Sequence, residues 1–370
     1  MKILVVGGGI IGCASAYELA KAGCAVTVLE RSTPGAEASG AAAGLLTVLG
    51  GSAVTAFGEL ALESWRRYPE VVRELRDRTG IDVEHVTHGT IYPLATAEDV
   101  RAAEAKLRHP WAREIGIEAW DAGDVRSREP ALATSVRGAM FIRGDHWVNN
   151  QRLVVAYAQA AVGAGVAMMT GAAVSRIVVE DGHARGVIVD GEPYEADAVL
   201  LAAGAWTGAL AASFGARLRV EPRKGQMVAL THVPQILTHA IHGEDVYLVP
   251  RASGELLIGA TVEQVGFQRS VTAIGIAGLL TAAMTLVPGL ASLPISRTWY
   301  GFRPWAPDSL PILGPWPGID GLFVATAHYR NGILLAPITA RLMTEWMTHG
   351  QPSLDVKDFL PDRFIKDRRS

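Results

Sequence analysis

Three glycines near the start of the chain have the spacing of a phosphate-binding turn. Gly7, Gly9 and Gly12 follow an apolar run at residues 2–6 and precede a helical stretch at residues 13–22. In such a turn Gly7 allows the sharp bend, Gly9 lets a pyrophosphate approach the backbone, and Gly12 lets helix and strand pack closely. The N-terminus of the helix would offer its unpaired N–H groups to the phosphates.

A carboxylate completes this pattern. A second apolar run, at residues 26–29, ends at Glu30, which lies 18 residues after Gly12. A carboxylate at this position accepts hydrogen bonds from ribose hydroxyls and repels a 2′-phosphate. Glycine spacing alone is weak evidence, but strand, glycines, helix, strand and carboxylate together predict that the chain binds a dinucleotide.

Composition narrows the class of protein. The chain has 370 residues, 49% of them hydrophobic and 19% charged, which is typical of a well-packed protein of about two domains. Its net charge of −3 gives no reason to expect a nucleic-acid partner. Cys13 and Cys24 both fall in the first βαβ unit, so we expect no disulfide and a reducing, cytoplasmic compartment. The ten histidines are scattered, and we expect no metal site.

One uncharged segment approaches a membrane span in length. No charged residue lies between Arg269 and Arg297, and residues 271–287 are mostly apolar. Two glycines inside the segment and a Pro-Gly pair after it argue against a span. We predict a helix that is buried or lies at a subunit contact of a homo-oligomer, with peripheral membrane contact as the alternative. The apolar N-terminus is predicted to be a strand and not a signal peptide.

Helical and strand-like segments alternate along the rest of the chain. Helices are predicted at residues 53–78, with a kink or break at Pro69, and at residues 97–108 and 153–162. Strands are predicted at residues 83–94, 138–142, 167–170, 174–179, 184–189 and 198–203, with a polar connection at 120–130 and a hairpin turn at 180–182. Residues 220–261 are strand-rich, and residues 322–347 predict a strand, a turn and a closing helix.

Several of these segments resemble one enzyme family over essentially the whole chain. The segments are residues 7–30, ASGAAAGLL at 38–46, LAAGAWT at 201–207, YLVPR at 247–251, GATVE at 259–263, GFRPWAPDSLPILG at 301–314 and HYRNGILLAP at 328–337. They look like the FAD-dependent amine oxidases of the D-amino-acid oxidase type. Within that group the chain resembles the bacterial glycine oxidases associated with thiamine biosynthesis.

The resemblance implies a fold and a reaction. The fold is an α/β, Rossmann-like FAD-binding domain with a mixed sheet, discontinuous in sequence, and a second α+β substrate domain on an antiparallel sheet. The expected FAD domain comprises residues 1–80, 146–219 and 305–370, and the substrate domain comprises residues 81–145 and 220–304. The implied reaction uses noncovalently bound FAD to oxidise glycine, sarcosine or a small D-amino acid to an imine, while dioxygen becomes hydrogen peroxide.

Three side chains are expected to bind the substrate and act in catalysis. Arg303 can hold a carboxylate by two parallel hydrogen bonds, as the matching arginine does in similar oxidases. Tyr247 can donate its phenolic hydrogen to the same carboxylate. Arg330 is expected near the flavin at the substrate end of the pocket.

The flavin is expected to meet mostly backbone. The helix after Asn331 can direct its N-terminal amides at the ring, and the small-residue segment at 38–46 can pack along one ring face. For His328 we expect a structural role beside the flavin. The full set predicted to bind the cofactor is Gly7, Gly9, Ile10, Ile11, Gly12, Glu30, Arg31, Ser39, Gly40, Ala43, Gly44, Leu45, Val174, Ala203, Gly204, Trp206, Arg303, His328, Arg330, Asn331, Gly332, Ile333 and Leu334.

Some alternatives stay open. Val262 stands where similar glycine oxidases often have a methionine in the pocket, so a strict preference for glycine is in doubt. An amino-acid dehydrogenase of the same fold would pass electrons to a quinone or a partner protein, and the uncharged segment at 271–287 is the feature that favours it. A flavin-binding protein without catalysis is disfavoured by the presence of Arg303 and Tyr247. An exchangeable nicotinamide fits the C-terminal HYRNG segment less well than a buried flavin.

Overall fold

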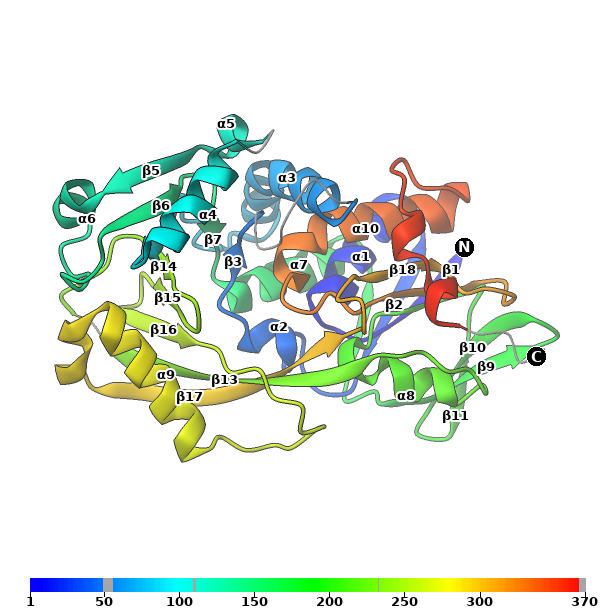
Figure 1. The fold of residues 1–370 in the computed structure, drawn as a ribbon. Helices are drawn as coiled ribbons and strands as arrows, with labels where there is room; N and C mark the ends of the chain where they lie inside the picture. Colours follow the sequence, from blue (N-terminus) through cyan, green and yellow to red (C-terminus); the bar gives the residue numbers. More distant parts are fainter. Residues whose placement is uncertain (49–55, 109–110, 232, 366–370) are drawn as a thin grey trace.

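Two sheets form the framework of the molecule (Figure 1). The structure is a computed structural model that describes residues 1–48, 56–108, 111–231 and 233–365. The first sheet has the order β18 (Ile312–Pro315), β19 (Leu322–Thr326), β12 (Ala198–Leu201), β1 (Lys2–Val6), β2 (Ala25–Glu30), β8 (Ala167–Thr170). Its strands are parallel except that β18 runs antiparallel to β19.

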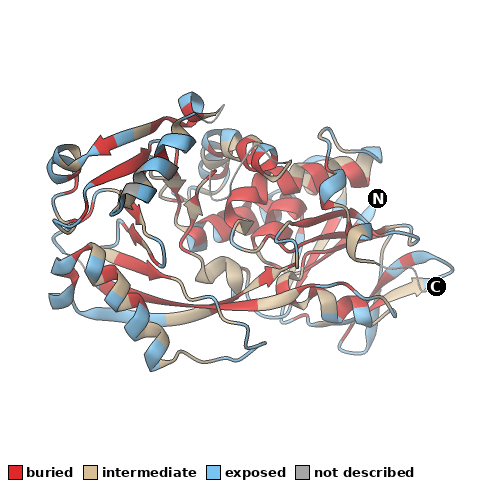
Figure 2. Cartoon of the chain, viewed as in Figure 1, coloured by how far each residue is buried: buried red, intermediate tan, exposed pale blue. Residues whose placement is uncertain are grey.

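The first sheet is apolar on both faces because both faces are covered. Ile3 and Val5 of β1 point into a core shared with α1 (Ile10–Lys21), α3 (Ala56–Thr79), α7 (Asn150–Gly163) and α10 (Gly332–His349). Leu4 and Val6 point to the opposite face, as strand alternation requires, and pack under a small sheet of β9 (Val174–Glu180), β10 (His183–Val189) and β11 (Glu192–Glu195). Figure 2 shows this central region as almost entirely buried.

The second sheet is mostly antiparallel. Its order is β17 (Ile295–Trp305), β13 (Glu221–Thr231), β16 (Glu255–Gly259), β15 (Tyr247–Pro250), β14 (Ala240–His242), β4 (Thr90–Leu94), β6 (Gly138–Ile142), β5 (Ile117–Asp121). Only β14 and β4 pair in parallel among the described strands of this sheet. The long strands β13 and β17 run along the base of the view in Figure 1. The predicted combination of a mixed sheet and an antiparallel sheet is confirmed.

The remaining elements lie between these strands in sequence or follow α10. They are α2 (Ala38–Ala41), β3 (Leu45–Leu46), α4 (Ala97–Leu107), α5 (Ala112–Ile115), α6 (Ala122–Arg128), β7 (His146–Trp147), η1 (Gly204–Trp206), α8 (Thr207–Ala212), α9 (Ala273–Leu286), η2 (Pro288–Ser292), η3 (Lys357–Phe359) and η4 (Pro361–Phe364). Among the described helices, none is both long and apolar enough to cross a membrane.

Several predicted elements match the structure and others need correction. The strand at 167–170 and the hairpin turn at 180–182 are present as predicted. The helix predicted from residue 53 continues unbroken past Pro69 to Thr79, while residues 53–55 lie outside the described part. The strand predicted at 83–94 is confined to Thr90–Leu94.

The polar connection predicted at 120–130 is wrong, because it contains the end of β5 and the helix α6. Asp121 caps α6 by accepting hydrogen bonds from the N–H groups of Gly123 and Asp124, at 2.7 and 2.9 Å. The Asp124 carboxylate accepts a hydrogen bond from the N–H of Asp121, which completes a capping box. The Asp-x-x-Asp spacing was a local signal for this helix.

The helix α9 is present, but it is not buried. Leu279 and Ala283 face the second sheet, whereas Ile274 is 83% exposed. In Figure 2 the helix lies on the outside of that sheet with much of its surface exposed. Burial of this helix within the chain is therefore wrong, and its contact with another subunit stays a prediction.

Candidate active site

The glycine turn before α1 is closed by backbone contacts. Gly7 has a φ of +110°, and a Cβ atom there would lie 2.6 Å from the carbonyl oxygen of Ala202. A Cβ atom on Gly12 would overlap the carbonyl oxygen of Gly7. Gly9 is different, because the nearest atom to a Cβ there is the Ser39 hydroxyl at 3.3 Å. The turn is therefore tight at Gly7 and Gly12 and open at Gly9, where a ligand must approach.

Glu30 is held by backbone amides at the end of β2. Its carboxylate accepts hydrogen bonds from the N–H of Gly8 at 2.7 Å and the N–H of Ser32 at 2.8 Å, and the residue is 9% exposed. Each carboxylate oxygen accepts one of these bonds. Since a carboxylate offers about four lone-pair sites, Glu30 retains capacity for ribose hydroxyls.

An aromatic and cationic stack stands beside Glu30. The guanidinium of Arg31 lies 3.8 Å from the ring centroid of Trp206, and Trp206 stacks on Phe267 with centroids 4.7 Å apart. Glu37 pairs with both Arg31, at 2.5 Å, and Arg269, at 2.9 Å. Arg31 and Trp206 were predicted from the sequence, whereas Phe267, Arg269 and Glu37 were not. Phe267 and Arg269 contact residues that are distant in sequence, and no motif marked the Glu37 carboxylate.

A large cavity of about 1520 Å³ connects the glycine turn to the second sheet. Its wall contains Tyr247 and most of the residues predicted to bind the cofactor: Gly7, Gly9, Ile10, Ile11, Glu30, Arg31, Ser39, Ala43, Gly44, Leu45, Val174, Ala203, Gly204, Trp206, Arg303, His328, Arg330, Asn331, Gly332 and Ile333.

Three residues of the predicted set lie outside this wall. Gly12 packs against the turn itself. Gly40 packs against Gly35, whose carbonyl oxygen a Cβ at residue 40 would overlap. Leu334 is buried in the core, and its carbonyl accepts a hydrogen bond from the Ser64 hydroxyl at 2.6 Å. Gly12, Gly40 and Leu334 therefore serve packing inside the protein and do not face the cavity.

The far end of the cavity lies against the second sheet. Arg303 of β17 donates a hydrogen bond from Nη1 to the carbonyl oxygen of Thr261 at 3.0 Å. The Tyr247 hydroxyl lies 3.3 Å from the Met227 sulfur. Burial raises the pKa of Tyr247, and the positive charges of Arg303 and Arg330 oppose that rise. Tyr247 therefore stays a neutral hydrogen-bond donor beside cationic groups.

The other predicted arginine is less enclosed. Arg330 is exposed at the cavity wall, and its guanidinium carbon lies 5.2 Å from the Tyr329 ring centroid. Its exposure places it at the rim of the cavity.

Further side chains that sequence analysis missed complete this end of the cavity. Tyr92, Met140, Met227 and His242 belong to its wall. Tyr92 stacks on His242 with centroids 5.1 Å apart, and its hydroxyl donates to Asp145 at 2.7 Å. Burial, together with the negative charge of Asp145, raises the pKa of Tyr92 well above its usual value. These residues lie on β4, β6, β13 and β14, so only the folded sheet brings them together.

His328 and the start of α10 close the side of the cavity. His328 is buried, its Nε2 atom lies 3.0 Å from the Thr339 hydroxyl, and burial lowers the pKa of its imidazole to about 3. The Tyr68 hydroxyl donates to the carbonyl of Ile333 and so ties α3 to the first turn of α10. A neutral, bonded His328 positions the segment leading to Gly332, where α10 begins.

Comparisons with known proteins agree with this arrangement. A family model described as FAD dependent oxidoreductase matches residues 2–346. The glycine oxidase of Geobacillus kaustophilus is 38% identical over 98% of this chain and 97% of its own length. The hydrogen cyanide synthase subunit HcnC of Pseudomonas aeruginosa is 34% identical over 98% of this chain and 96% of its length.

The fold is similar to a solved structure as well. The crystal structure of glycine oxidase from Geobacillus kaustophilus superposes with a TM-score of 0.93 at 36% identity, covering 98% of this chain and 99% of that one. Matches of this extent establish membership. The chain belongs to the FAD-dependent oxidoreductase family, and FAD is its cofactor.

Proposed function

We propose that this protein is an oxidase that uses noncovalently bound FAD to oxidise glycine and other small amines to the imine, with dioxygen reduced to hydrogen peroxide. The observation that carries the proposal is the position of Arg303 and Tyr247. Both line the cavity that begins at the Gly7 turn, and both can meet a substrate carboxylate. The chain's similarity to glycine oxidases supports the same reading.

The cavity fits FAD. Gly9 leaves room for a pyrophosphate at the N-terminus of α1, and Glu30 keeps acceptor capacity for a ribose. At the other end, Gly332 and Ile333 line the cavity at the N-terminus of α10, whose amides would meet the flavin ring. The positive end of this helix dipole favours negative charge there. When bound, FAD accepts the two electrons and the hydrogen lost from the substrate Cα.

The remaining work belongs to side chains that bind and orient the amino acid. A guanidinium can donate two parallel hydrogen bonds to a carboxylate, and a carboxylate bound to Arg303 would also accept one from Tyr247. Fixing the carboxylate at two groups restricts the positions that Cα and the amine can take relative to the cavity wall. Met140, Met227 and Tyr92 supply an apolar wall that limits the size of the side chain.

The size of side chain that the cavity admits also depends on Val262. Val262 lines the cavity, and its short side chain leaves more room there than a longer one such as methionine would. We therefore expect sarcosine and D-alanine to be accepted beside glycine. As part of the proposal, the FAD domain comprises residues 1–80, 146–219 and 305–370, the substrate domain comprises 81–145 and 220–304, and the protein works as a cytoplasmic homo-oligomer.

A dehydrogenase that passes electrons to a quinone or a protein partner is the second candidate. One side of α9 is apolar and exposed, and Ile274 on it is 83% exposed. This favours the dehydrogenase, because an exposed apolar surface suits contact with a partner protein or a membrane. The similarity to a relative that is named as a subunit points the same way.

Peroxide release separates the two candidates. The yellow purified protein would be given glycine, sarcosine and D-alanine in air, with peroxide and substrate loss measured together. One peroxide formed for each amine consumed supports the oxidase. Loss of amine only after an artificial electron acceptor is added, without peroxide, favours the dehydrogenase.

A further inference from the structure

A short segment after β16 forms an additional partner for β13. Lys224 and Glu263 exchange two backbone hydrogen bonds, at 3.0 and 2.9 Å, and the N–H of Thr261 donates to the carbonyl of Gln226 at 3.3 Å. On its other edge β13 pairs with β17, which carries Arg303. The central strand β13 therefore separates Arg303 from the segment of residues 261–263.

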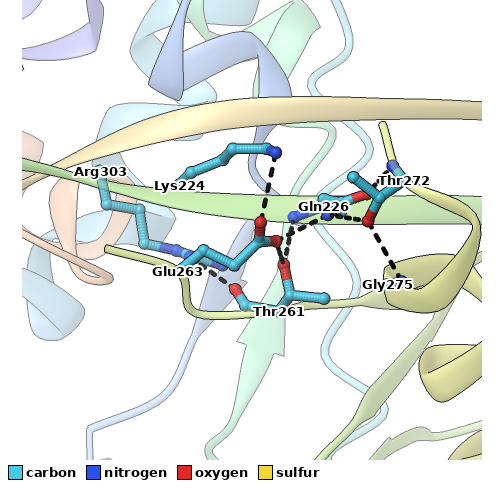
Figure 3. A network of polar contacts seen from close by, with 7 residues as sticks. All are labelled: Lys224, Gln226, Thr261, Glu263, Thr272, Gly275 and Arg303. Atoms are coloured by element: carbon cyan, nitrogen blue, oxygen red, sulfur yellow. Dashed lines mark hydrogen bonds and ion pairs between the residues drawn. The ribbon is translucent and has the colours of Figure 1, made fainter. Parts of the chain in front are cut away.

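Arg303 reaches across β13 to this segment. Its guanidinium passes over Gly225, where a Cβ atom would overlap both Nη atoms, and Nη1 donates to the Thr261 carbonyl at 3.0 Å. Figure 3 shows Arg303 directed toward Thr261, with Lys224 and Gln226 of β13 beside them. The position of the guanidinium thus depends on where the Thr261 carbonyl is held.

Side chains hold Thr261 in place. The Thr261 hydroxyl bonds to the Glu263 carboxylate and also accepts from the N–H of Gln226 at 2.9 Å. The amide of Gln226 donates to Glu263 at 2.7 Å, and the Lys224 ammonium lies 3.2 Å from the other oxygen of Glu263. Glu263 is therefore the group on which three side chains converge (Figure 3).

The charges in this network are balanced inside the protein. Lys224 is 0% exposed, and Glu263 is its ion-pair partner. Burial alone would raise the pKa of Glu263, but hydrogen bonds from Thr261 and Gln226 and the charge of Lys224 hold it below its usual value. A buried ammonium whose counter-charge is removed is strongly destabilised, so the pair stays together when the protein is folded.

The network also reaches the start of α9. Gln226 accepts a hydrogen bond from the N–H of Thr272 at 2.7 Å and donates to its hydroxyl at 2.9 Å, and that hydroxyl caps α9 at Gly275. A Cβ atom on Gly275 would lie 2.6 Å from the Gln226 amide nitrogen. The hydrogen-bond network that joins Arg303 to Glu263 is therefore also bonded to the N-terminus of α9.

We propose that Glu263, balanced by Lys224, is a positioning residue that fixes the Thr261 carbonyl and through it the carboxylate-binding guanidinium of Arg303. The inference rests on the proposed function, since it assigns Arg303 a carboxylate partner. Glu263 does not touch the substrate in this account. It acts by keeping the guanidinium in one orientation before the substrate arrives.

The substitution Glu263→Gln tests the inference in the FAD-loaded protein. Acetate serves as the probe, and its dissociation constant is measured from the change in flavin absorption. We expect the acetate dissociation constant and the KM for glycine to rise about tenfold, while kcat changes less than about twofold, because orientation of the bound carboxylate is lost and the chemistry is not. Flavin content per chain is measured alongside, so that both constants refer to the FAD-loaded fraction.

Two further variants keep the test decisive. Glu255→Gln is the matched control, because Glu255 pairs with Arg297 at 2.9 Å in the same sheet and is not part of the network. Its acetate affinity should equal that of the wild type. Thr261→Val keeps the Lys224–Glu263 pair and removes only the hydroxyl, so it remains informative if Glu263→Gln loses its flavin. It should weaken acetate binding in the same direction.

The possible failures are distinguishable. Wild-type protein that shows no saturable acetate effect and no competition with glycine contradicts the proposed function. Wild-type protein that binds acetate, together with Glu263→Gln and Thr261→Val proteins that bind it equally well, contradicts only the positioning role. A decrease in kcat with unchanged acetate affinity contradicts it too.

Discussion

The guanidinium of Arg303 lies over Gly225, in the space that any side chain at residue 225 would fill. The two residues belong to the paired strands β17 and β13, where Gly225 is opposite Gly301 and Arg223 is opposite Arg303. A glycine in the middle of a strand is normally unfavourable, because it has no side chain to pack. Here its missing side chain creates the site for the arginine.

Gly225→Ala should displace the Arg303 guanidinium while leaving the strand pairing intact. We expect the KM for glycine to rise by at least about tenfold, since the added methyl group overlaps both Nη atoms. Steady-state kinetics would check this. Gly163→Ala is the control, because a Cβ atom there meets nothing within 4 Å. Unchanged kinetics in Gly225→Ala would show that Arg303 does not need this position.

Arg303→Ala should retain FAD and lose affinity for carboxylates. Removal of two charge-assisted hydrogen bonds predicts that the KM for glycine rises at least about 100-fold. Arg297→Ala, on the same strand but paired with Glu255 at the surface, should leave the KM near its original value. An unchanged KM in Arg303→Ala would remove this residue from the substrate site.

Phe267→Ala should weaken FAD binding. Phe267 stacks on Trp206, which in turn contacts Arg31 in the cavity wall. An aromatic pair contributes about 0.5–1.5 kcal/mol, so the dissociation constant of FAD should rise about two- to tenfold. Equilibrium dialysis or flavin fluorescence would measure it. Val265→Ala, in the same segment, should bind FAD as the wild type does, and equal affinity in both variants would argue against a role of the stack.

The stability of the protein should decrease as the pH falls below neutrality. Burial lowers the pKa of His328 from 6.5 to about 3, so as the pH falls the unfolded chain takes up this proton before the folded protein does. The stability that this neutral group provides is fully present above pH 6.5 and is lost progressively between pH 6.5 and about 3.

A variant isolates this contribution. His328→Gln should show a smaller decrease in Tm than the wild type between about pH 7.5 and about pH 5, because the glutamine cannot take up a proton there. His349→Gln, at the exposed end of α10, is the matched control and should follow the wild type. Identical pH profiles for His328→Gln and the wild type would contradict this assignment.

Most of what depends on local backbone geometry was predictable from the sequence. The turn at Gly7 and Gly12, the strand at 167–170 and the hairpin at 180–182 depend on neighbouring residues, and their sequence signals are correspondingly clear. Pro69 misled the prediction because helix α3 is held by distant contacts, among them the hydrogen bond from Tyr68 to Ile333. Tertiary packing outweighs the unfavourable proline in this helix.

The site itself was only partly predictable. Arg303 and Tyr247 stood out because they lie in segments that resemble a known family. Glu263 also lies in such a segment, but Glu263 and Phe267 contact partners about 35 to 60 residues away, Gln226 and Trp206, so no local pattern indicated their roles. Of the two predicted positions of α9, burial within the chain was wrong for a related reason, since an apolar composition does not specify what covers a helix. A subunit contact stays a prediction.

The most direct test of the central claim is anaerobic mixing of the yellow protein with glycine, sarcosine and D-alanine while flavin absorption is recorded. We predict that at least glycine bleaches the flavin, and that Arg303→Ala protein needs far higher concentrations for the same effect. Flavin that stays oxidised with all three amines, in protein that holds a full complement of FAD, would contradict it.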